Sequence, residues 1–165
     1  MIAPTITGSL LIMTIIAMWT DFRYRKIPNW LTFTGILSGF VYHGLATGLS
    51  GLQLAGVGFA LGVAILFFPF AKGGIGAGDV KMLAALGTWM GAEMLLPACL
   101  WMGVIGACLS LYAIWKQRIW KLAFYGLTVK GVATECRIPY GIAIGLGIWL
   151  ELGRLFWLTA GGSWG

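Results

Sequence analysis

The chain has 165 residues, of which 59% are hydrophobic and only 10% charged, and its formal net charge is +6. This composition excludes an ordinary soluble domain, and the gathering of Lys and Arg in a few connections argues against nucleic-acid binding. Apolar stretches of roughly 17 to 25 residues span a bilayer as helices, whereas the alternating pattern of a barrel strand is absent from the sequence. We therefore predict an all-α, polytopic membrane helix bundle, with one integral membrane domain over residues 1–165.

The first apolar stretch predicts a helix over residues 4–19. No Lys or Arg precedes it, and no small-x-small cleavage site follows it before Asp21, so we expect a retained span and not a removed signal peptide. The connection after it carries three cations, Arg23, Arg25 and Lys26. An excess of Lys and Arg is typical of cytoplasmic loops, so this connection is predicted to face the cytoplasm.

The next stretches predict helices over residues 30–46 and 52–71, joined by an uncharged loop that suits the outer face. Residues 80–115 would make a single helix of about 54 Å, which is too long for one crossing. Two shorter helices are therefore expected, with a turn between Gly91 and Pro97.

The remaining part of the chain predicts an interfacial segment and a last span. Residues 116–130 mix cations with large apolar side chains, as expected of a helix lying in the inner interface. A final helix is predicted over residues 138–158. Counting crossings against the charge bias gives about six transmembrane helices with both termini on the outer face. Asp21 and Asp79 then both fall on the cytoplasmic side of the inner (plasma) membrane.

Two aspartates at predicted membrane boundaries indicate chemistry, because acidic residues are costly there. Asp79 ends a Gly76-Ala77-Gly78-Asp79 segment, whose glycines are expected to adopt backbone angles closed to other residues and to let an extended substrate strand approach. A second carboxylate nearby, that of Asp21, would share one proton with it. Such a pair activates water for attack on a carbonyl without a covalent intermediate.

Each aspartate also has an ordinary interpretation. Asp79 can cap the helix that follows the glycines, and Asp21 can pair with Arg23 or Arg25. Their occurrence together on one face favours a site. The three cysteines form no CxxC motif and have no clustered His partners, so neither a metal nor another cofactor is expected.

Three segments resemble the type IV prepilin peptidases, which are membrane aspartyl proteases. They are residues 21–31 (DFRYRKIPNWL), residues 76–83 (GAGDVKML) and, less closely, residues 137–141 (RIPYG). The resemblance implies that Asp21 and Asp79 are the catalytic pair of an aspartic-type endopeptidase. It further implies cleavage of a short basic leader from a pilin-like precursor, after a glycine, at the cytoplasmic membrane face.

The larger members of that family carry a cytoplasmic insertion with paired CxxC motifs and N-methylate the new terminus. This chain has neither the insertion nor those cysteines, so methyltransferase activity is not expected. The short form resembles the peptidases of tight-adherence (Flp) pilus systems. The partners implied are a prepilin or pseudopilin substrate, membrane lipid and other pilus-assembly membrane proteins.

Further residues are expected to shape the site or to contact substrate. Lys81 either lowers the pKa of the catalytic pair or orients substrate, or it extends to lipid headgroups. Pro28 and Asn29 are expected to fix the turn before the second helix, with Asn29 as its cap. His43 lies toward the outer end of that helix, and a structural or exposed role is expected for it and not a catalytic one. The remaining candidates are Gly76, Gly78, Arg137, Pro139, Tyr140 and Gly141.

Two other functions stay open from the residues. A small proton- or cation-coupled transporter would use the same carboxylates, but it is expected to show acidic or broken helices near the bilayer midplane and an inverted repeat. A non-catalytic subunit of a pilus or secretion assembly would not need both aspartates.

Overall fold

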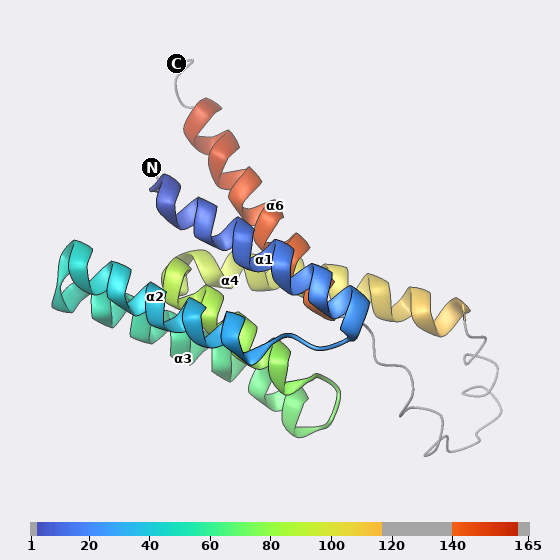
Figure 1. Ribbon diagram of the computed structural model, residues 1–165. Coiled ribbons are helices and arrows are strands. Elements are labelled where there is room, and N and C mark those ends of the chain that lie inside the picture. Colours follow the sequence, from blue (N-terminus) through green and yellow to red (C-terminus); the bar gives the residue numbers. More distant parts are fainter. Residues whose placement is uncertain (1–2, 117–139, 162–165) are drawn as a thin grey trace.

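The computed structural model describes residues 3–116 and 140–161, and no strand occurs in either range (Figure 1). Its elements are α1 (Pro4–Tyr24), α2 (Asn29–Thr47), α3 (Leu49–Ala71), α4 (Ala77–Lys116) and α6 (Tyr140–Gly161). Within these ranges, α1, α3, α4 and α6 each contain a stretch long and apolar enough to cross a membrane. The all-α membrane architecture is therefore as predicted.

The number of crossings is not fixed by these helices. α2 is not among the four candidate spans, and its sequence carries Thr, Ser, Asn and His side chains among the apolar ones. The arrangement of six spans with both termini outside stays a prediction. Two further predictions lie outside the described residues. They are the interfacial helix, of which only Lys116 is described, and the candidate site residues Arg137 and Pro139.

The end of α1 differs from the prediction. The helix runs on to Tyr24, so that Asp21 lies in its last turn and not in the connection. Arg25 ends the helix in the left-handed conformation, with φ 51°, and its N–H donates to the carbonyl of Asp21 at 2.8 Å. The helix continues because neither Pro nor Gly occurs between Trp19 and Arg25, and the three cations remain exposed beyond the apolar turns.

The long helix α4 is broken at Gly91, within the interval where a turn was predicted. Gly91 has φ 67° and ψ 177°, a conformation that residues with a side chain rarely adopt. The chain reverses there, so the first half of α4 runs beside α2 and α3 and the second half passes behind α1 and α6 in the view of Figure 1. The predicted division into two helices is confirmed.

The first half of α4 forms the centre of the bundle. Every residue from 82 to 91 is buried, and α3 makes its largest interface with this helix. Gly58 of α3 and Gly87 of α4 face each other so closely that a methyl group on either would overlap the other's carbonyl. Because Asp79 begins this buried helix, its place is fixed by the core.

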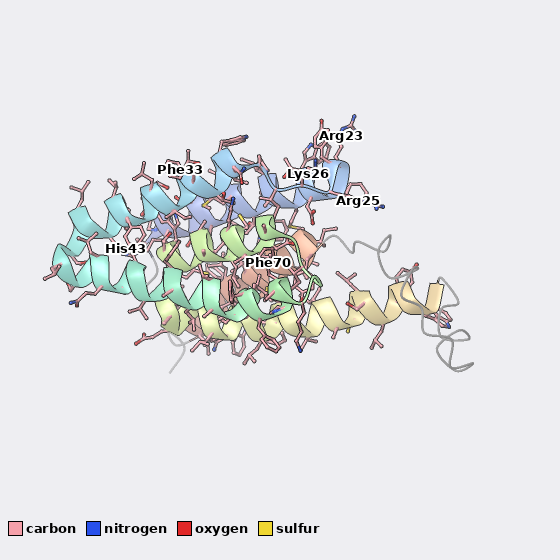
Figure 2. The ribbon with its side chains drawn as sticks, turned by 90° about the horizontal axis from the view of Figure 1, so that it is seen from below. Arg23, Arg25, Lys26, Phe33, His43 and Phe70 are labelled. Carbon is pink, nitrogen blue, oxygen red and sulfur yellow. The ribbon has the colours of Figure 1, made fainter. Side chains whose placement is uncertain are left out.

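His43 and Trp89 tie α2 to the same central helix. Trp89 donates from Nε1 to the carbonyl of Gly35 at 2.9 Å, and His43 Nε2 lies 3.2 Å from the carbonyl oxygen of Trp89. His43 is buried and lies far from the three cations at the end of α1 (Figure 2). This position agrees with the structural role predicted for it.

Candidate active site

A cavity of about 370 Å³ opens at one end of the bundle, where α1 ends and α2, α4 and α6 begin. Asp21 of α1, Asp79 of α4 and Tyr140 of α6 all line it. Its remaining walls come from the connections that follow α1 and α3, from Asn29 at the start of α2, and from Ala77, Gly78 and Lys81 of α4. The fold thus places the two predicted aspartates in the wall of one cavity, although they are distant in the sequence.

Asp21 is held by the first turn of α6. The residue is only 6% exposed, and its Oδ2 accepts a hydrogen bond from the N–H of Gly141 at 2.8 Å. Its own helix disfavours a carboxylate here, because the last turn of a helix is its negative end. The opposing N-terminus of α6 supplies free N–H groups and positive potential, and so offsets that effect.

Gly141 leaves the room that this contact needs. A Cβ atom at this position would lie 2.7 Å from Asp21 Oδ2, 3.0 Å from its Cβ and 3.1 Å from its Cγ. These separations are shorter than ordinary van der Waals contacts between such atoms. The glycine predicted as a site-shaping residue therefore contacts the aspartate itself.

Asp79 combines a capping contact with a place in the cavity. It is the third residue of α4, and its Oδ2 accepts the N–H of Gly76 at 3.1 Å, while its own N–H donates to the Gly76 carbonyl at 3.1 Å. This is the half of a capping box in which a third-position side chain reaches back to the cap. The capping interpretation is thus partly correct, and it does not remove Asp79 from the cavity wall.

One of the two reasons expected for the glycines of this segment, the need for unusual backbone angles, is wrong. Positive φ angles occur, among the described glycines, at Gly48, Gly73 and Gly91, and not at Gly76 or Gly78. A Cβ atom on Gly78 would instead lie 3.3 Å from Cβ of Ile27. Gly78 therefore serves the close approach of the connection that follows α1, and Gly73 provides the left-handed turn after α3.

Asn29 does not cap α2, contrary to the prediction. The N-cap is Pro28, with extended backbone angles and no side-chain cap bond, and Asn29 is the first helical residue. Its Oδ1 accepts a hydrogen bond from Lys81 Nζ at 3.0 Å. The pair joins the first turns of α2 and α4 at the cavity, which both residues line.

Cations surround the same end of the molecule. Arg23 lies in the last turn of α1, and Arg25 and Lys26 directly follow that helix (Figure 2). Arg25 and Lys26 line the cavity together with Lys81. Arg25, Lys26 and Ile27 were not predicted as lining residues, although their position directly after Asp21 was the available signal. Within the described ranges, no three His, Cys, Asp or Glu side chains are grouped so that they could hold a metal ion.

Comparison with known proteins relates this cavity to an enzyme family. Residues 8–111 match the type IV leader peptidase family. The chain belongs to this family. The matched segment contains both aspartates, together with Asn29 and Lys81. Tyr140 and Gly141 lie beyond the matched segment in the sequence. As the first residues of α6, they lie at the same end of the bundle as the two aspartates.

Several relatives in the family bear the name prepilin leader peptidase/N-methyltransferase. The relative from Burkholderia pseudomallei strain K96243 is 32% identical over 164 residues, which cover 94% of this chain and 47% of the relative. The relative from Escherichia coli K12 is 29% identical over 166 residues, covering 94% of this chain and 67% of the relative. The chain thus spans about half the length of the Burkholderia relative. No solved structure matches the chain.

Proposed function

We propose that this chain is a membrane aspartyl endopeptidase that removes the leader from prepilin-like precursors. The observation that carries the proposal is the presence of Asp21 and Asp79 in the wall of one cavity at one end of a membrane helix bundle. Family membership and the printed names of the relatives support the same activity.

In the proposed reaction the two carboxylates share one proton, because like charges in one small cavity are not both ionised cheaply. The ionised carboxylate takes a proton from water as the water attacks the scissile carbonyl. The protonated carboxylate donates to the developing oxyanion, and a proton then passes to the leaving amine. The N–H of Gly141 holds Asp21 and the N–H of Gly76 holds Asp79 during this exchange.

The substrate is proposed to carry a short basic leader, a glycine at the cut and a long apolar helix. Arg23, Arg25 and Lys26 favour a cytoplasmic position for this end of the bundle, and hence an active site that faces the cytoplasm from the inner membrane. We place the protein with the short peptidases of Flp-type pilus systems and expect no methyltransferase activity. Lipid and other pilus-assembly membrane proteins are its proposed surroundings.

Cleavage by purified protein tests this function. Wild-type protein should shorten a prepilin-type precursor by its leader, as measured by mass spectrometry, and Asp21→Asn and Asp79→Asn should each abolish the product while remaining folded. Glu93→Gln is the matched control, because Glu93 is exposed and lies beyond the break at Gly91, which is itself about 18 Å along the first half of α4 from Asp79. It should cleave like the wild type.

Other outcomes distinguish the alternatives. Full processing by either Asp→Asn variant contradicts the proposed pair. A purified wild-type protein that leaves the precursor intact contradicts the activity and favours a non-catalytic assembly subunit. Proton or cation uptake in proteoliposomes that both Asp→Asn substitutions abolish, with the precursor uncut by the wild type, favours a transporter.

A further inference from the structure

We propose that Gly141 is the positioning residue of Asp21: its N–H and its lack of a side chain fix where the carboxylate stands in the cavity. The inference rests on the proposed function, because it gives Asp21 a role in the reaction. It goes further because the position of the Asp21 carboxylate is assigned to a residue on another helix, far from Asp21 in the sequence.

Two independent features of Gly141 act on the same atom. Its N–H donates to Oδ2 of Asp21 at 2.8 Å, and a Cβ atom in its place would stand 2.7 Å from that oxygen. The first feature attracts the carboxylate to the start of α6, and the second permits it to come that close. Gly141 is buried and is not among the residues that line the cavity, so its effect on substrate passes through Asp21.

The register between α1 and α6 is held further along the same interface. Trp149 of α6 donates from Nε1 to Oγ1 of Thr14 at 2.9 Å, and Thr14 is buried. This bond lies about two turns of helix from the Asp21 contact on both helices. The first turn of α6 is therefore not free to slide away from a side chain added at position 141, and the carboxylate must move instead.

The other glycines of α6 provide matched controls for the same chemical change. A Cβ atom at Gly145 would press on the flexible side chain of Met18, one turn before Asp21 on α1. A Cβ atom at Gly153 would meet nothing within 4 Å. All three Gly→Ala changes add one methyl group and the same helix propensity, but only the change at Gly141 touches Asp21.

The first measurement is prepilin cleavage by purified Gly141→Ala, Gly145→Ala and Gly153→Ala proteins. Gly141→Ala should lower kcat by about 100-fold with KM unchanged, since displacing a reacting group by about 1 Å has an effect of that size. Gly153→Ala should cleave like the wild type. A wild-type kcat for Gly141→Ala, or an equal loss in Gly145→Ala, overturns the inference.

The second measurement needs no activity and follows the thermal unfolding of single and double variants. Gly141→Ala should lower Tm, and most of this loss should disappear in the Asp21→Ala background, because Oδ2 and Cγ are then gone. The effect of Gly145→Ala should be the same in both backgrounds. If Gly141→Ala does not fold, recovery of folding with Asp21→Ala supports the contact, and additive or unrescued losses overturn it.

The two measurements separate the inference from the proposed function. The effects of Gly141→Ala and Asp21→Ala on Tm could be coupled while the wild-type protein cleaves no precursor. That result would reject the peptidase activity and the catalytic role assigned to the two aspartates, but not the contact between Gly141 and Asp21. Additive Tm values together with normal cleavage by the wild type would reject only the positioning role of Gly141.

Discussion

Lys81 donates a hydrogen bond from Nζ to Oδ1 of Asn29 at 3.0 Å, and this bond joins the first turns of α4 and α2 at the wall of the cavity. The two residues are 52 positions apart. The helix cap expected of Asn29 does not describe this arrangement. Lys81 instead reaches over the cavity from the turn that carries Asp79.

We expect Asn29→Ala and Lys81→Met to have coupled effects on stability. Both side chains are exposed, so the bond should contribute about 1 kcal/mol or less, and the double variant should lose little more than either single variant. Thermal unfolding of the four proteins measures this coupling. Asn29→Asp is the control, because it preserves the acceptor and should keep the wild-type Tm. Fully additive losses would show that the two residues act separately.

The two roles of Asp79 can be separated by the choice of substitution. Asp79→Asn keeps an oxygen that accepts the Gly76 N–H, whereas Asp79→Ala removes it. We expect Asp79→Ala to lower the free energy of unfolding by about 1 kcal/mol, the usual effect of losing a helix cap, and Asp79→Asn to change it much less. Both variants should fail to cleave a prepilin. Equal stability of the two would mean that the capping contact contributes nothing, and cleavage by Asp79→Asn would remove Asp79 from the reaction.

The sequence was informative where local chemistry decides the outcome. The apolar stretches predicted the helices to within a few residues, and helix length alone required the break that occurs at Gly91. The contact between Gly141 and Asp21 was not predictable in the same way, because it depends on how α1 and α6 pack. The same limit explains the errors at Asn29 and Gly78, because their partners, Lys81 and Ile27, are distant in the sequence.

Glu151 is another residue that the pattern of the sequence did not single out. It lies inside α6 with a fully buried side chain, where an acidic residue is costly. Arg154, one turn later, binds it with two hydrogen bonds, including Nε to Oε2 at 2.9 Å. Buried charges are tolerated when they are paired and hydrogen-bonded, so Arg154 makes the buried position of Glu151 possible.

The stability of the variants should depend on which member of this pair is replaced. Arg154→Gln leaves the Glu151 carboxylate buried without its cation and should lower Tm strongly. Adding Glu151→Gln should recover much of the loss, because a neutral amide costs less to bury than a carboxylate. Thermal unfolding of both single variants and the double variant measures the effect. Prepilin cleavage by the folded double variant should match the wild type, since Glu151 lies about 15 Å along α6 from Gly141. A double variant less stable than Arg154→Gln alone would contradict this account of the pair.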